Sequence, residues 1–229
     1  MKLSAILLAR TLGFIETFDL NPRGQVFYPD VVKRIVERYQ FQKFPQQFQD
    51  FDEQKGIEFL SGKIGGEVIE RLVIYNTGIL IDTRSSTNAS KALLEDALSW
   101  AKSTFGLNYQ PEMIRRFGYV SQITFYSEVS LNELNPALQK LADRLTSIVS
   151  EIHGEKVQYQ TSSLAIHHDP LTRKNGIAGL TIFPRADTPF SRNKYFSEAP
   201  LPTDTHIALL EEFEGDVLRQ NDLSKPRAE

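Results

Sequence analysis

The stretch from Glu67 to Leu107 carries the clearest local structural information in the chain. Residues 68–75 and 79–83 are rich in β-branched and aliphatic side chains, and the Asn-Thr-Gly sequence between them suits a tight turn because Asn and Gly tolerate positive φ. Residues 85–88 offer several hydroxyl and amide side chains that can cap a helix, and Gly106 is a typical helix end. The stretch therefore predicts a β-hairpin followed by a helix.

The rest of the chain continues the same alternation of strand and helix patterns. A period of two residues predicts strands, and apolar residues at helical spacing predict helices. We predict strands over 3–20, 57–64, 115–129, 157–168 and 176–184, helices that begin at Pro29, at Asn135-Pro136 and at Thr203, and a loop over 185–202. Runs of strands packed under helices are typical of an α+β fold with a mainly antiparallel sheet.

The 229 residues fit one large domain or two small ones. The order strand, helix, hairpin, helix occurs over 1–107 and again over 115–219, which suggests an internal repeat of two such units. Because only a short connection separates the halves, we expect a shared sheet and a single domain over 1–219. Residues 220–229 are polar and are predicted to be a disordered tail.

Composition excludes several classes of function. The net charge of −3 gives no general attraction to nucleic acid or to an anionic membrane. The chain has no cysteine, which excludes disulfides, thiolate metal sites and a cysteine nucleophile. No segment reaches the ~20 apolar residues that span a bilayer, and Arg10 interrupts the apolar run at the amino terminus, which we interpret as a first strand. We expect a cytoplasmic protein.

Three segments together resemble one family. They are Phe59 with the strand 79–83 that leads into a helix, the motif Arg116-Phe117-Gly118-Tyr119-Val120, and the terminal helix that begins at His206 and contains Phe213-Glu214. The chain is similar in these places to a sporadically distributed family of uncharacterised bacterial proteins, although the asparagine that follows the tyrosine in that family is missing here. The resemblance implies an α+β fold and a distribution compatible with a role in defence, and it implies no reaction.

The predicted loop over 185–202 is the first candidate binding surface. A connection of this length inside a compact domain is often functional, and exposed aromatic residues beside arginine favour protein interfaces. A packed or mobile surface loop and, less favoured, a nucleic-acid contact remain open. The residues that would contact a protein partner are Arg185, Phe190, Arg192, Lys194, Tyr195 and Phe196.

The segment between the predicted hairpin and its helix is a second candidate site. Backbone amides at a helix start can hold an anion, and Arg84 would add positive charge. Ser85, Ser86 and Thr87 would complete such a site. The segment lacks the glycines of a phosphate-binding loop, and a simple helix cap is the alternative interpretation.

His167, Asp169 and His206 are the third candidate, as ligands of a catalytic metal. His167 and His168 are neighbours on a predicted strand and face opposite sides, so the pair cannot easily share one ion. Two ligands are also too few for a tetrahedral site. The chain has no Gly-x-Ser-x-Gly, Ser-x-x-Lys or His-Glu-x-x-His signature, and we assign no catalytic residue and no cofactor.

The sequence favours a non-catalytic protein that acts by binding, as an assembly subunit or adaptor of a bacterial complex with a possible place in defence. Association with a protein partner or with itself is expected through the 185–202 segment. A small-ligand or nucleotide-sensing module with an anion site near Arg84 is the alternative. A metal-dependent hydrolase that uses His167, Asp169 and His206 is the third hypothesis.

Overall fold

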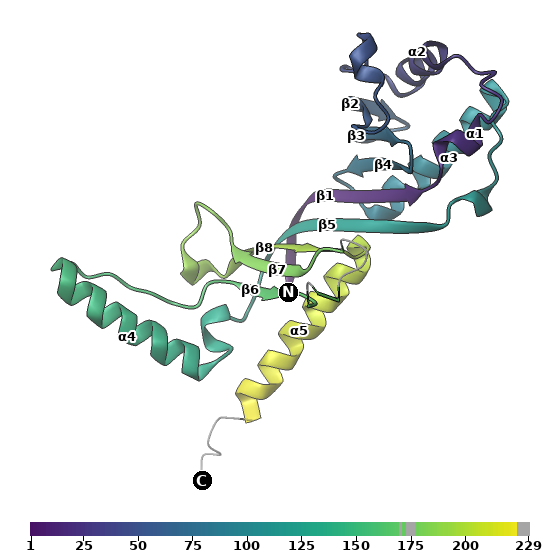
Figure 1. Cartoon of the computed structure of the whole chain (residues 1–229). Helices are drawn as coiled ribbons and strands as arrows, with labels where there is room; N and C mark the ends of the chain where they lie inside the picture. Colours follow the sequence, from purple (N-terminus) through teal and green to yellow (C-terminus); the bar gives the residue numbers. More distant parts are fainter. Residues whose placement is uncertain (170, 173–176, 224–229) are drawn as a thin grey trace. The chain divides into compact units, whose positions relative to one another are not determined.

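The computed structural model in Figure 1 describes residues 1–169, 171–172 and 177–223. It contains an eight-stranded antiparallel sheet and five α-helices, which confirms the predicted α+β class. The strand order is β2-β3-β4-β1-β5-β8-β7-β6. Strands that follow each other in the sequence pair as hairpins at both ends of this order, as β2–β3–β4 and as β6–β7–β8.

The elements follow each other along the described chain with short connections. The strands are β1 (Lys2–Phe14), β2 (Ile57–Ile64), β3 (Glu67–Tyr75), β4 (Gly78–Thr83), β5 (Arg116–Tyr126), β6 (Leu164–Ile166), β7 (Leu180–Pro184) and β8 (Lys194–Ala199). The α-helices are α1 (Thr17–Leu20), α2 (Tyr28–Tyr39), α3 (Thr87–Phe105), α4 (Pro136–His153) and α5 (Thr203–Leu223). Short 3-10 helices are η1 (Phe48–Phe51), η2 (Pro111–Met113), η3 (Leu131–Glu133) and η4 (Phe190–Arg192).

The chain forms two compact units, which we describe separately. One consists of Ile6–Gln122 and Pro200–Asp204, and we call it the β2–β4 unit. The other consists of Met1–Ala5, Ile123–Ala199 and the chain from Thr205 on, and we call it the β6–β8 unit. These boundaries differ from those of the two predicted halves, and the internal repeat stays a prediction.

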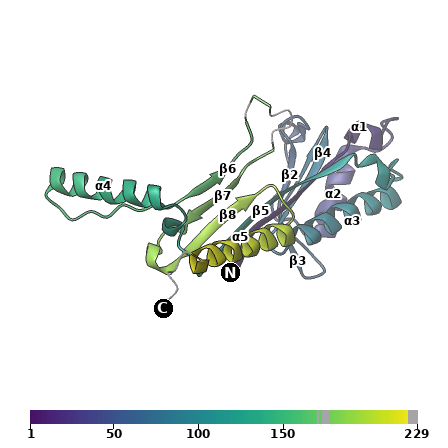
Figure 2. The same cartoon turned by 90° about the horizontal axis from the view of Figure 1, so that it is seen from below.

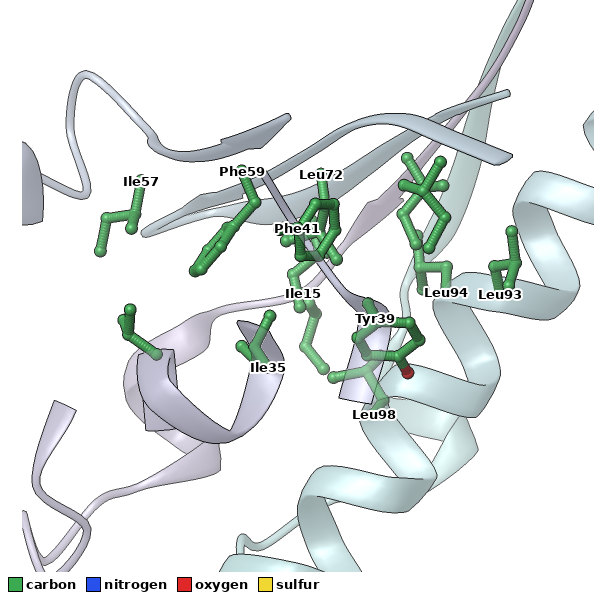
Figure 3. Packing of buried hydrophobic residues seen from close by; sticks show 14 of the residues in the cluster. Ile15, Ile35, Tyr39, Phe41, Ile57, Phe59, Leu72, Leu93, Leu94 and Leu98 are labelled. Atoms are coloured by element: carbon green, nitrogen blue, oxygen red, sulfur yellow. The ribbon is translucent and has the colours of Figure 1, made fainter. Parts of the chain in front are cut away.

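The core of the β2–β4 unit lies between its strands and the helices α2 and α3. Phe59, Leu72 and Ile81 occupy paired positions across β2, β3 and β4, so their side chains share one face of the sheet. Figure 3 shows that side chains from this face meet those from the helices, among them Tyr39 of α2 and Leu94 of α3. The apolar faces of the strands and of the helices therefore cover each other.

Helix α3 has the ends that its sequence predicts. The Ser86 hydroxyl accepts a hydrogen bond from the Ala89 amide at 3.1 Å, which caps the amino end. Gly106 ends the helix with φ of 72°, a conformation that glycine adopts without a steric penalty. The start of α3 is also tied to the start of α5. The Thr87 amide donates to the Thr203 hydroxyl at 3.1 Å, and the Thr203 amide donates to the Thr87 hydroxyl at 2.8 Å.

The core of the β6–β8 unit lies between its strands and α5. Leu210 and Val217 of α5 are buried, as are Ile123 of β5 and Ile182 of β7. Glu214 is buried on the same helix and accepts hydrogen bonds from the Ser127 hydroxyl at 2.7 Å, from the Glu128 amide at 2.9 Å and from the amino group of Met1. A buried carboxylate is tolerated here because several donors satisfy it.

Strand β8 shows that the prediction of a long loop over 185–202 is wrong. Its buried positions alternate along the strand as Tyr195, Ser197 and Ala199, and Phe196 pairs with Phe183 of β7. Only the first of these three buried residues is large and apolar. The period of two is therefore weak in the sequence, although the strand is well formed.

Three other boundaries also differ from the sequence prediction. The first strand ends at Phe14, and α1 follows it, because the Thr17 amide donates to the Asn76 carbonyl at 2.9 Å instead of continuing a strand. The strand predicted over 157–168 is reduced to the three residues of β6. Helix α5 continues to Leu223, so residues 220–223 are helical, and residues 224–229 of the predicted tail lie outside the described part of the chain.

Replacement of a core leucine tests the packing of the β2–β4 unit. Leu94 of α3 is fully buried, and its side chain lies against Gly13 of β1. Leu94→Ala should lower the free energy of unfolding by about 2–5 kcal/mol, because it removes buried methyl groups and leaves a cavity. Urea denaturation measures this change. Val68→Ala, at an exposed position of β3, is the control and should stay within about 1 kcal/mol of the wild type. Equal effects of the two substitutions would contradict the assigned core.

Candidate interface on helix α4

Helix α4 has strong local signals at both ends. The Asn135 side-chain oxygen accepts hydrogen bonds from the amides of Ala137 at 2.9 Å and Leu138 at 3.3 Å. Proline at the first helical position needs no amide donor. At the other end, Gly154 has φ of 67° and its amide donates to the Ser150 carbonyl at 3.0 Å. The helix therefore begins where the sequence predicts, and glycine ends it.

The apolar side of α4 is exposed along its whole length. None of its 18 residues, all of which the structure describes, is buried. Figures 1 and 2 show the helix projecting away from the strands of its own unit. We call the five large apolar residues the α4 stripe: Leu138, Leu141, Leu145, Ile148 and Ile152, which are 45%, 62%, 42%, 45% and 72% exposed. Contiguous apolar patches of this kind mark interaction sites on proteins.

The chain that follows α4 runs back along a flank of the helix. The Tyr159 amide donates to the Thr146 hydroxyl at 2.8 Å. The Ser150 hydroxyl donates to the Val157 carbonyl at 3.2 Å and accepts from the Val157 amide at 3.1 Å. At 3.6 residues per turn, Thr146 and Ser150 lie about 100° and 140° around the helix from Leu145. The returning segment is thus held at one side and leaves the α4 stripe open.

Charged side chains form the opposite border of the α4 stripe. Arg144 and Glu151 lie about 100° and 120° from Leu145 on the side away from the returning segment. Both are exposed, and among the described residues no ion pair involves either of them. Ala142 and Val149, which are half-buried, form the other border. The stripe is therefore flanked by charge on one side and by small apolar side chains on the other.

The six residues predicted to contact a partner do not form one exposed loop. Tyr195 belongs to the core, where its ring lies 5.8 Å from that of Phe125 and its hydroxyl accepts a hydrogen bond from the Leu131 amide at 3.2 Å. Lys194 places its amino group 5.0 Å from the centre of the Tyr126 ring. These two residues stabilise the β6–β8 unit, and the prediction of Tyr195 as an exposed contact is wrong.

The other four predicted contacts keep at least partial exposure. Phe196 is half-buried on β8, and Phe190 of η4 is 47% exposed. Arg185 and Arg192 are exposed. Their role in binding a partner stays a prediction. They offer one large, largely exposed aromatic side chain, Phe190, and so present less continuous apolar surface than α4.

The predicted anion site near Arg84 contains two carboxylates. The Arg84 guanidinium forms an ion pair with Glu70, with Nε 3.1 Å from a carboxylate oxygen. The Ser85 hydroxyl donates to the Glu67 carboxylate at 2.8 Å. An incoming anion would meet the negative charge of both glutamates, which opposes binding.

The remaining two residues of this site are used by the helix start itself. Ser86 caps α3, and Thr87 is buried and exchanges hydrogen bonds with Thr203. The anion-binding role of residues 84–87 stays a prediction, and the contacts of all four residues favour the alternative of a cap and connection.

The structure does not bring the predicted metal ligands together. His167 and Asp169 are exposed, whereas His206 is fully buried. The His167 ring lies close against Gly179, where an added Cβ would overlap ring atom Nδ1. Within the described ranges no three His, Asp or Glu side chains are grouped to hold a metal ion.

His206 instead forms a buried pair with a serine that the sequence did not indicate. The Ser197 hydroxyl lies 2.9 Å from His206 Nε2 and 2.9 Å from the Thr181 carbonyl oxygen. Since the carbonyl can only accept, the single hydroxyl proton goes to Thr181, and His206 Nε2 must donate. The imidazole therefore cannot act as a base toward Ser197, and both residues are fully buried. The pair connects α5 to β8, and its geometry does not suit a nucleophile.

The β2–β4 unit contains a cavity of about 230 Å³ between its sheet and helices α1, α2 and α3. Its wall is mainly apolar, with Ile35, Leu98 and Trp100 among the lining residues. Glu53 and Asn21 contribute polar groups. No lysine or arginine is among the described residues that line it, so nothing in the wall would neutralise a phosphate.

Comparison with protein-family models and with curated proteins gives no match for this chain. Among the described residues, no helix combines the length and apolar composition needed to cross a bilayer.

The buried imidazole predicts a specific pH dependence of stability. Burial lowers the pKa of His206 to about 4, whereas a histidine in the unfolded chain titrates near 6.5. The contribution of neutral His206 to the free energy of unfolding is complete above pH 6.5. It is lost as the pH falls toward 4, because the histidine of the unfolded chain takes up a proton first. His206→Asn should remove this pH-dependent contribution. Between pH 6.5 and 4 the free energy of unfolding of the wild type should therefore fall by about 1–3 kcal/mol more than that of the variant.

Urea denaturation at several pH values between 4 and 7 gives the comparison. His153→Asn, which changes an exposed histidine at the end of α4, is the control and should follow the wild-type curve. A His206→Asn curve parallel to that of the wild type would show that the imidazole is not buried in its neutral form.

Proposed function

We propose that the protein acts by binding another protein chain, as an assembly subunit or adaptor, and that the α4 stripe is its contact surface. The observation that supports this is the exposure of five large apolar side chains on one well-capped helix. A place in a bacterial complex with a role in defence, as the family resemblance implies, belongs to the same proposal. The surface differs from the 185–202 segment that the sequence favours.

The energetics of burial support a stable contact. Complete burial of a Leu or Ile side chain contributes about 1.5–3 kcal/mol, and association costs about 4–15 kcal/mol in lost translational and rotational freedom. The five stripe residues are 42–72% exposed, so each can gain about half of that amount on binding. Five such residues on each side of a contact can still offset much of the cost when the partner is also apolar. Because α4 is already helical and capped at both ends, little additional ordering is needed on binding.

The geometry indicates the kind of partner surface. An exposed helix with apolar residues spaced by three and four positions fits a groove between other helices or the apolar face of one helix. The returning segment restricts access from one flank. A partner must therefore approach the stripe directly or from the side of Arg144 and Glu151.

A photo-crosslinking experiment in the native host tests the contact surface. We expect p-benzoylphenylalanine at the position of Leu141 to give a covalent adduct of discrete mass on irradiation, because this side chain belongs to the stripe and is 62% exposed. Mass spectrometry of the adduct identifies the bound chain. Adding Ile148→Asp, about two turns of the helix away, should abolish the adduct, since a charge would be buried in the contact.

The control places the same crosslinker at Leu209, an exposed leucine on α5 that is 40% exposed. It should give no adduct of comparable yield. Equal yields at the two positions, or an adduct at Leu141 that survives Ile148→Asp, would contradict a specific contact at the α4 stripe.

A second function is supported by the cavity of the β2–β4 unit, namely the binding of a small, mainly apolar ligand. A volume of about 230 Å³ is below the usual range for drug-sized ligands. The alternative of a nucleotide ligand fits less well, because the described wall carries no cationic side chain and Arg84 is paired with Glu70. Glu53 could accept a hydrogen bond from a polar end of the ligand.

Filling the cavity tests this second function. N-phenyl-1-naphthylamine, which fluoresces in apolar sites, should bind the wild type saturably with one molecule per chain. Ala97→Phe should abolish this signal, because Ala97 lines the cavity from α3, and it should change the thermal midpoint by less than about 4 °C. Ile148→Asp in α4 is the control and should leave the signal unchanged. An unaltered titration with Ala97→Phe would rule out the cavity as the site.

A further inference from the structure

We propose that the chain that covers the α4 stripe is a second copy of this protein, with the two α4 helices packed side by side in antiparallel directions. This inference rests on the proposed binding function of α4 and names the partner. Two observations support this self-pairing, namely the spacing of the stripe and the order of charges along its border.

The spacing of the α4 stripe is that of a helix seam. Leu138, Leu141, Leu145, Ile148 and Ile152 follow each other at intervals of three, four, three and four residues. This is the pattern with which two helices pack knobs into holes at a small crossing angle. The same residues on a second copy provide a matching seam, so the surface can complement itself.

The charged border of the stripe selects the antiparallel direction. In an antiparallel pair, Leu141 lies beside Ile152 of the second copy and Leu145 beside Ile148 of the second copy. Arg144 then faces Glu151 of the second copy, because both occupy the border position immediately before a seam residue. Two-fold symmetry produces the same ion pair twice. The border thus places opposite charges together at both ends of the contact.

The other border also fits this direction. Ala142 and Val149, on the side of the returning segment, are small, half-buried and uncharged, so this border brings no unpaired charge against the second copy. In a parallel pair, the border positions pair differently, and Arg144 would face Val149 of the second copy. The guanidinium would then lose solvent contact without gaining a charged partner. The antiparallel pair therefore gives Arg144 and Glu151 partners of opposite charge, and the parallel pair does not.

Because the chain has no cysteine, single-cysteine variants can measure the direction of pairing. Leu141→Cys and Ile152→Cys are prepared separately, mixed under reducing conditions to allow exchange, and then mildly oxidised. The mixture should give a disulfide-linked dimer that contains one chain of each variant. Each variant alone should give little dimer, because equivalent positions lie about 16 Å apart along an antiparallel pair.

Two other outcomes of this experiment would overturn the proposal. Rapid dimer formation by each variant alone would show parallel packing and would overturn the proposal. The absence of any dimer, together with a monomeric mass in size-exclusion chromatography with light scattering, would also overturn it. Both positions are exposed on the helix, so the substitutions should leave the fold intact, as circular dichroism can verify.

Charge reversal tests the proposed ion pairs independently. Arg144→Glu or Glu151→Arg alone should raise the dissociation constant of the dimer by about tenfold, because each creates two like-charged pairs. The double variant Arg144→Glu/Glu151→Arg restores opposite charges across the pair and should recover most of the affinity. Sedimentation equilibrium provides the dissociation constants. Asp143→Arg, on the side of the helix away from the stripe, is the control and should have little effect.

The failure of this inference is distinguishable from the failure of the binding function. If the protein is monomeric but the crosslinker at Leu141 captures a different chain in the host, the α4 stripe is a binding surface for another protein, and the self-pairing is wrong. If the crosslinker captures nothing and the protein is monomeric, both are wrong. A double charge variant that binds as weakly as the single variants would contradict the antiparallel register.

Discussion

In aqueous solution the apolar faces of helices and strands must be buried against other parts of the protein. This requirement determines the organisation of both units. The chain has no cysteine, so no disulfide contributes to stability and packing must supply it. Helix α3 meets the requirement by burying Leu93, Leu94 and Leu98 against the sheet. Helix α4 has an equally regular apolar side, and all five residues of its stripe stay exposed. That contrast is the strongest functional signal in the molecule, because the uncovered side stands out against well-packed surroundings.

The sequence predicted those features that depend on interactions within a few residues. Ser86 and Asn135 cap their helices through amides two or three residues away. Gly106 and Gly154 end the same helices with positive φ. The hairpin of β3 and β4 likewise follows from its turn and from the aliphatic residues on each side. Local chemistry was sufficient for these elements and for the α+β class.

The sequence could not predict features that depend on contacts between distant segments. Thr87 and Thr203 are 116 positions apart and cap each other's helices. Tyr195 looked like an exposed aromatic residue of a loop, but pairing with β7 places it in the core. Leu94 and Leu141 occupy similar patterns on similar helices, yet one is fully buried and the other is 62% exposed. The exposure of each leucine depends on whether another element packs against its helix. The apolar pattern of a single helix does not contain this information.

An apolar stripe alone would favour association without specifying direction or register, and the charges beside it supply both. If the antiparallel pair slid by one heptad in one direction, Arg144 would face Arg144 of the second copy. A slip in the other direction would place Glu151 against Glu151 of the second copy. Either slip also leaves part of the seam uncovered, so repulsion and lost burial act together. A single register therefore combines complete overlap of the stripes with two opposite-charge pairs.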